Sequence, residues 1–111
     1  MTEAAARRLA LSFPESEEKP HFDRAAFKVA GKRGRIFCTL GDGTLNLKVE
    51  PRARVYQLLK DRPDVFLDLG GWTRMGFVGI KLSKVKAPEL RALVTDAWKR
   101  VAPKRALVHL T

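Results

Sequence analysis

Hydrophobic residues alternate with polar ones over three short stretches in the first half of the chain, residues 27–29, 36–40 and 45–49. A period of two places successive side chains on opposite faces of a β-strand. Glycine-containing segments at residues 31–34 and 41–43 separate the stretches, and the Asp-Gly pair in the second suits the positive φ of a tight hairpin turn. The pattern therefore predicts three consecutive antiparallel strands.

Helical spacing takes over after the third strand. Val55, Leu58 and Leu59 follow the i, i+3, i+4 pattern of one helix face. Pro51 stands where the first turn of a helix tolerates proline, and Pro63 ends the segment. These residues predict one helix between the two prolines.

The most regular helical pattern begins at Pro88 and ends before Pro103. One continuous apolar stripe runs along it, formed by Leu90, Leu93, Val94, Ala97, Trp98 and Val101. Such a stripe is the core-facing side of an amphipathic helix. Trp98 is therefore predicted to be a core residue.

Shorter elements complete the chain. Thr2 is expected to cap a helix through about residue 12, with Ala6, Leu9, Ala10 and Phe13 on its apolar face, and Pro14 ends it. The other predictions, in chain order, are a loop over residues 14–18, a strand over 65–67, a loop over 70–76, a strand over 77–82 and a short helix over 104–110.

The order of these elements, α-β-β-β-α-β-β-α-α, indicates the fold class. Short turns join antiparallel neighbours, and there are too few crossover helices for a parallel sheet. We expect an α+β two-layer sandwich in which an antiparallel five-stranded sheet has its helices packed on one face. Residues 1–111 would form one domain. The other face of the sheet would be open to a partner.

The charge of the chain points to polyanionic partners. The formal net charge is +10. Up to residue 24 there are four basic and five acidic residues, whereas beyond it there are 18 basic and seven acidic residues. A basic body favours nucleic acid, acidic proteins or anionic lipid heads, although many small proteins are basic without binding DNA specifically.

Cysteine usage and hydropathy favour a cytoplasmic protein that does not enter a membrane. The single cysteine, Cys38, excludes an intramolecular disulfide and alternates with apolar residues, so it is expected to face the core as a small hydrophobe. No apolar run approaches the ~20 residues of a membrane helix. The start at Thr2-Glu3 lacks the hydrophobic segment of a secretory signal.

Catalytic and metal-binding signatures are absent from the sequence. The two histidines, His21 and His109, have no metal-ligand spacing with the cysteine, and no serine stands in a nucleophile elbow. The chain is therefore expected to be no enzyme and to need no metal or cofactor. An enzyme or small-ligand protein would require His21, Arg74 and a carboxylate to converge in a cleft.

Basic residues gather in two connecting segments. The first is the Gly31-Lys32-Arg33-Gly34-Arg35 turn, and the second is the segment 81–86, which has no acidic residue. Either could contact a phosphate backbone, and either could instead be a solubilising turn that discourages edge pairing. The residues proposed to contact DNA are Lys32, Arg33, Arg35, Arg74, Lys84 and Lys86.

Aromatic residues suggest a second class of partner. Trp72 stands beside Arg74 in a glycine-rich segment, where an aromatic can stack on a base, although closing the end of a core is the commoner role. If Phe22, Phe37 and Trp72 were exposed as one patch, a protein-interaction or chaperone-like module would be favoured. His21, Phe22 and Trp72 are therefore candidate ligand or partner contacts. The partner could be an acidic protein, and the chain a monomer or homodimer.

Together these residues resemble the MmcQ/YjbR family. The resemblance covers nearly the whole chain and rests on Ser12-Phe13-Pro14, Lys19-Pro20-His21-Phe22, Phe27-Lys28-Val29, Gly31-Lys32, Ile36-Phe37, Leu47-Lys48, Trp72, Ala97-Trp98 and Ala102-Pro103-Lys104-Arg105. It implies an α+β fold of the CyaY-like or secretion-chaperone-like kind. It also implies the DNA-binding role commonly assigned to the family, with a proposed double-wing arrangement. The turn at residues 31–35 is longer and more basic than is usual in the family, which strengthens a role for its charge.

Overall fold

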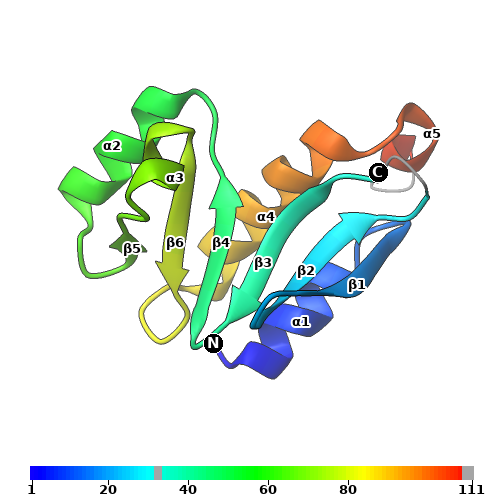
Figure 1. Cartoon of the computed structure of the whole chain (residues 1–111), viewed down its shortest axis with the longest axis horizontal. Coiled ribbons are helices and arrows are strands. Elements are labelled where there is room, and N and C mark those ends of the chain that lie inside the picture. The colour runs from blue at the N-terminus through cyan, green and yellow to red at the C-terminus, as the bar shows by residue number, and fades with distance from the viewer. Residues whose placement is uncertain (32–33, 109–111) are drawn as a thin grey trace.

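The computed structural model describes residues 1–31 and 34–108 and shows a curved antiparallel sheet with helices against it (Figure 1). Lys32, Arg33 and His109, which the sequence analysis singled out, lie outside the described residues. The elements are α1 (Glu3–Leu11), β1 (Ser16–His21), β2 (Arg24–Val29), β3 (Ile36–Gly41), β4 (Thr44–Lys48), α2 (Arg52–Asp61), β5 (Phe66–Leu67), α3 (Gly71–Arg74), β6 (Phe77–Lys81), α4 (Ala87–Val101) and α5 (Lys104–Leu107).

The sheet has six strands in the order β1-β2-β3-β4-β6-β5, and every neighbouring pair is antiparallel. The predicted α+β class and antiparallel sheet are confirmed. The prediction of five strands is wrong, because β1 occupies part of the segment expected to be a loop. Its sequence, Ser-Glu-Glu-Lys-Pro-His, has no apolar alternation to reveal it. The strand forms by pairing along its whole length with β2, and Pro20 is tolerated because β1 is an edge strand.

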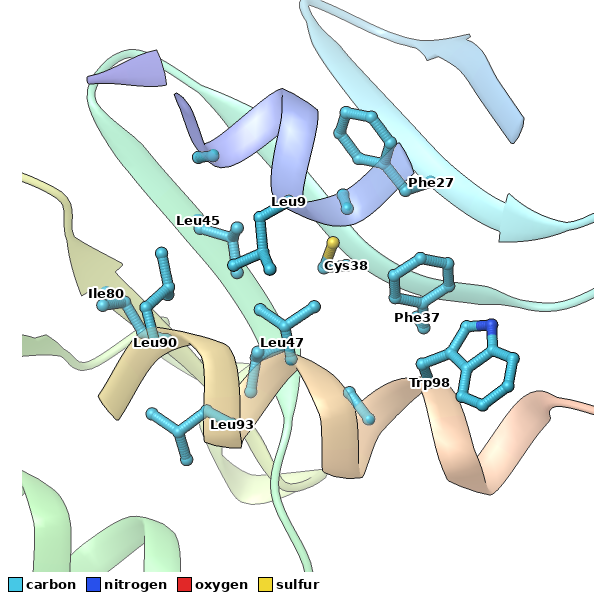
Figure 2. Packing of buried hydrophobic residues seen from close by; sticks show 14 of the residues in the cluster. Leu9, Phe27, Phe37, Cys38, Leu45, Leu47, Ile80, Leu90, Leu93 and Trp98 are labelled. Carbon is cyan, nitrogen blue, oxygen red and sulfur yellow. The ribbon is translucent and has the colours of Figure 1, made fainter. Parts of the chain in front are cut away.

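Helices α1 and α4 cover one face of the sheet, and the hydrophobic core lies between these helices and that face (Figure 2). Leu45, Leu47 and Ile80 project from β4 and β6, and Leu90 and Leu93 meet them from α4. These side chains are less than a twentieth exposed. Removing their apolar surface from water is the main favourable contribution to the stability of this layer.

Trp98 anchors the far end of the same core. Its ring stacks on Phe13 at 5.6 Å between centroids, and Phe13 meets Phe37 edge to face at 6.1 Å. The indole Nε1 donates a hydrogen bond of 3.2 Å to the carbonyl oxygen of Pro14. The predicted core role of Trp98 is confirmed. The bond ties the last turns of α4 to the residues that follow α1.

A bulge in β3 brings two consecutive side chains to the core. Phe27 pairs with Cys38 and Lys28 pairs with Ile36, so Phe37 is the extra residue. Phe37 and Cys38 are both buried, whereas strict alternation would place them on opposite faces. Cys38 is a buried free thiol as predicted, and burial raises its pKa. Phe37 is consequently not part of an exposed aromatic patch.

The shorter helices follow the sequence in most respects. Thr2 Oγ1 accepts a hydrogen bond from the Ala5 backbone N–H, so the predicted cap of α1 is confirmed. Pro51 directly precedes α2, and α5 begins at Lys104. The segment 70–76, expected to be a loop, contains the helical turn α3. Within the described residues no helix is long and apolar enough to cross a bilayer.

Candidate functional site: a groove on the open face of the sheet

The face of the sheet opposite α1 and α4 is built from the alternate residues of each strand. The register places Ala26, Thr39, Asn46 and Gly79 in one row across β2, β3, β4 and β6. Two residues further along β4 and β6, the next open-face residues are Lys48 and Phe77, which pair with each other. The row is therefore a mixed surface of small and polar side chains, in contrast to the aliphatic face beneath it.

A groove of about 760 Å³ lies over this face. One wall is the β1–β2 turn, His21 to Arg24, and the other is formed by Leu69, Trp72 and Phe77. Thr39, Asn46 and Ile36 line the groove between these walls. This volume falls within the range of about 300–1,000 Å³ that is usual for ligand pockets.

The groove reaches α4 because β3 and β4 separate at one end. Their pairing stops at Cys38 and Leu47, and Figure 1 shows the two strands diverging beyond that point. Ala97, Arg100 and Val101 of α4 line the groove there. Arg100 bridges the gap, because its Nη1 donates to the carbonyl oxygen of Lys48 at 2.9 Å while its own carbonyl oxygen accepts from Arg35 Nη2 at 3.1 Å.

Arg24 holds the β1–β2 turn against the β3–β4 hairpin. Its Nε and Nη2 donate to Thr39 Oγ1 and to the Thr39 carbonyl oxygen, both at 3.1 Å. Nη1 and Nη2 donate to Thr44 Oγ1 at 3.1 Å and to the Thr44 carbonyl oxygen at 2.9 Å, and Nη1 also reaches the Gly41 carbonyl oxygen at 2.9 Å. All five N–H groups of the guanidinium are thus used. Desolvation lowers the pKa of Arg24, and the guanidinium remains charged.

The sequence analysis did not single out Arg24. The only available signal was an arginine at the start of a predicted strand, which is not distinctive. Because its donors all have protein acceptors, Arg24 serves to position the wall of the groove rather than to bind a ligand.

Asn46 is the polar residue at the centre of the floor. Its Oδ1 is buried without a hydrogen-bond partner among the described residues. The neighbouring Gly79 has no side chain and so leaves space for this oxygen, because a Cβ atom on Gly79 would stand 3.1 Å from it. Asn46 therefore carries a buried acceptor with unused hydrogen-bonding capacity beneath the floor of the groove.

Two aromatic side chains are exposed on opposite walls of the groove. Phe22, in the β1–β2 turn, is 95% exposed, and Trp72, in α3, is 61% exposed. Trp72 meets Phe77 edge to face at 5.6 Å between centroids, and Phe22 meets His21 at 4.9 Å. Exposed rings of this size at the mouth of a groove are typical of binding surfaces.

Trp72 does not take the commoner role of closing the end of the core, because 61% of the residue is exposed. Thr73 takes the buried position of α3 instead, and its Oγ1 accepts a 2.6 Å hydrogen bond from the Leu69 backbone N–H. The helical turn that begins after Gly70 therefore directs the neighbouring indole outward. A loop without this turn, which the sequence suggested, would not fix that direction.

The separated end of the groove and the surface beside it are basic. We call this surface the basic rim and define it as Arg35, Lys48, Arg52, Arg74 and Arg100. Its members are joined by contacts: Arg52 Nη1 donates to the Arg74 carbonyl oxygen at 3.1 Å, and both Arg52 and Lys48 lie against Gly76.

The basic rim contains more cations than its acidic neighbours neutralise. Glu50 lies 3.7 Å from both Lys48 and Arg100. Among the described residues, no carboxylate lies within 4 Å of the cationic groups of Arg35, Arg52 or Arg74. Arginine side chains whose guanidinium groups have no carboxylate partner are suited to phosphate and carboxylate ligands.

The four described basic residues that were proposed to contact DNA divide between the two ends of the sheet. Arg35 and Arg74 are both at the end of the sheet where Lys48 pairs with Phe77. Lys84 and Lys86 follow Lys81, which pairs with Thr44 at the opposite end. Lys84 and Lys86 do not line the groove. The structure thus brings Arg35 and Arg74 to one rim and separates them from Lys84 and Lys86.

The residues considered for catalysis do not form one cluster around the groove. His21 lines it beside Asp23, but Arg74 is not among its lining residues. In residues 1–31 and 34–108 no group of three or more histidine, cysteine, aspartate or glutamate side chains could hold a metal ion. What the groove offers chemically is flat aromatic surface, an amide, a hydroxyl and a cationic end.

Comparisons with known proteins identify the family. The model of the YjbR family matches residues 11–100. No curated protein matches the chain. The crystal structure of Deinococcus radiodurans protein DR2400, described with the family domain DUF419, is similar with a TM-score of 0.78 and 22% sequence identity, over 98% of this chain and 87% of that one. At this identity the similarity supports the fold alone. The chain belongs to the YjbR family.

Proposed function

We propose that the protein binds DNA through phosphate contacts at the basic rim, without catalysing a reaction. The observation that carries this proposal is the set of five cations beside the groove, with which Glu50 is the only carboxylate to form ion pairs among the described residues. Each cation that replaces a condensed counterion on a phosphate adds affinity that falls with salt. The net charge of +10 would add long-range attraction of the same sign.

This proposal replaces a contact made by two basic loops with a contact made by one rim. Arg35 and Arg74 remain in the proposed site, and Lys48, Arg52 and Arg100 join them. Lys84 and Lys86 stay outside it because they lie at the opposite end of the sheet. Lys32 and Arg33 shortly precede Arg35 in the sequence, but they lie outside the described residues.

The test compares two double variants that lose the same charge at opposite ends of the sheet. One is Arg35→Gln with Arg74→Gln, and its matched control is Lys84→Gln with Lys86→Gln. Binding of a labelled DNA hairpin that carries a single-stranded tail is titrated at several salt concentrations. This probe presents both paired and unpaired strands, so the result does not depend on which one the protein prefers.

We expect the rim variant to bind more weakly and to lower the slope of log K against log salt by about 0.7–0.9 for each phosphate contact removed. The control should retain most of the affinity and the slope. Equal losses of DNA affinity in the two variants would show that only the overall charge matters and would contradict binding at the basic rim. Absence of binding at low salt would overturn the proposal altogether.

A second candidate function is docking of an acidic protein on the open face. The exposure of Phe22 and Trp72 favours it, because such rings often anchor protein interfaces. The predicted three-residue patch is incomplete, since Phe37 is buried in the core.

A further inference from the structure

We propose that the groove takes a single-stranded segment of nucleic acid, whose unpaired bases stack on Trp72 and Phe22 while its phosphates meet the basic rim. This inference rests on the proposed DNA-binding function and specifies the form of the ligand. It follows from the position of the two exposed aromatics, from the backbone of Phe22 and from the way the rim joins the groove.

The indole of Trp72 has a free stacking surface. Its contact with Phe77 is edge to face, with an angle of 84° between the rings. Such a contact occupies at most one of the two faces of the indole, and 61% of the residue is exposed. A base can stack on an aromatic face whatever its identity, because every base has a π-surface of its own.

Phe22 is held in an unfavourable backbone conformation at the other wall. Its φ is +59°, a value that disfavours bulky L-residues and suits glycine or asparagine. The side chain is also 95% exposed, so burial of the ring in this protein does not compensate for that conformation. Local strain of this kind is concentrated at ligand-binding sites. The five hydrogen bonds of Arg24, two residues away, hold the turn in place.

An unpaired base fits this site better than a duplex does. In a duplex the faces of each base are covered by its neighbours, so flat exposed rings find no surface on which to stack. A single strand exposes both the faces and the Watson–Crick edges of its bases. Thr39 lines the groove, and its Oγ1, which accepts a hydrogen bond from Arg24 Nε, keeps its own O–H to donate to such an edge.

The phosphates would meet the rim at the separated end of the groove. Arg35, Lys48 and Arg100 line both the groove and that end, so one continuous surface leads from the aromatic walls to the cations. Grooves that combine aromatic stacking with a basic track are the usual design of single-strand binders. An acidic peptide would use the same cations but has no need for two exposed stacking faces.

The experiment compares a single-stranded oligonucleotide with a duplex that contains the same strand, using the full chain at low salt. Trp72 is exposed and the other tryptophan, Trp98, is fully buried, so ligand-dependent quenching of fluorescence reports on Trp72. The variants are Trp72→Leu, Trp72→Phe and Tyr56→Leu. Tyr56 is a matched control because it is an exposed aromatic that does not line the groove.

We expect the single strand to bind more tightly than the duplex and to quench the fluorescence. Trp72→Leu should weaken single-strand binding roughly 5- to 150-fold, the loss of one base stack. Trp72→Phe should retain most of the affinity without the quenching, and Tyr56→Leu should behave as the parent protein. Thermal unfolding of each variant confirms that the fold is retained.

Three results would overturn the inference. Equal affinity for the single strand and the duplex, with the rim variant still defective, would leave the proposed function standing and remove the single-strand assignment. An unchanged single-strand affinity in Trp72→Leu would remove the stacking role. Displacement of the strand by poly-glutamate at equal charge concentration, with the same quenching, would assign the groove to acidic peptides. Failure to bind either DNA would instead contradict the proposed function itself.

Discussion

The two faces of the sheet are built from the same strands but differ in composition and in role. On the covered face, Leu45, Leu47 and Ile80 pack against helices and make an aliphatic core. On the open face, the alternating residues are Thr44, Asn46 and Lys48 on β4 and Phe77, Gly79 and Lys81 on β6. The first face supplies stability, whereas the second supplies a groove bordered by exposed aromatic rings and cations. The alternation of side chains along each strand thus separates the residues that stabilise the fold from those that form the groove.

The two tryptophans provide the sharpest test of this difference. Trp98→Ala should lower the free energy of unfolding by about 3–5 kcal/mol, because a fully buried ring leaves a cavity. Trp72→Ala should change it by less than about 1 kcal/mol, since most of the side chain is already in water. Urea unfolding of both variants makes the measurement. Similar losses in both would mean that Trp72 also supports the core.

Trp98→Phe serves as the companion to the core variant. It keeps an aromatic ring beside Phe13 and loses the hydrogen bond to the Pro14 carbonyl oxygen. Its loss should be smaller than that of Trp98→Ala, which keeps the comparison measurable if the alanine variant does not fold.

Arg24 tests whether a polar network can stabilise the open face. Arg24→Met keeps the length of the side chain but removes five hydrogen bonds, three of them to backbone carbonyl oxygens of β3 and β4. We expect a loss of about 2–3 kcal/mol, because acceptors under the turn lose their partner. Arg35→Met, which removes a single exposed hydrogen bond, is the control. Equal stability of the two variants would contradict a structural role for Arg24.

Phe22 should give the smallest change in stability and the most informative one. Phe22→Gly relieves the positive φ, so the free energy of unfolding should stay level or rise by up to about 1 kcal/mol. Affinity for single-stranded DNA should fall at the same time. Phe22→Ala removes the ring but keeps the unfavourable φ, and it should lose affinity without any gain in stability. A destabilised glycine variant would argue against strain at this turn.

Local sequence patterns predicted most of the covered face. The stripe of α4, the alternation of β4 and the cap at Thr2 each involve residues close in the chain, and each depends on one period or one hydrogen bond. Cys38 was placed in the core by the same alternation. These features follow from local geometry, so they could be predicted without knowing which elements pack against each other.

Local patterns failed where pairing with a distant segment decides the structure. Strand β1 contains charged residues and a proline, and only its pairing with β2 makes it a strand. The bulge at Phe37 breaks the alternation that otherwise identified β3. The outward direction of Trp72 depends on the single turn of α3 and on Thr73 taking the buried position. None of these has a signature in a window of a few residues.

By itself, the sequence determined the class of the fold, the covered face and the excess of positive charge, because periodicity and charge are properties of the chain alone. Only the tertiary structure decided where that charge acts. Arg35, Lys48, Arg52, Arg74 and Arg100 are scattered over 66 positions of the sequence, and they meet because β3 and β4 separate beside α4. The same folding sets Lys84 and Lys86 apart. A binding surface depends on distances in space, and the antiparallel register, rather than the order of residues, sets those distances.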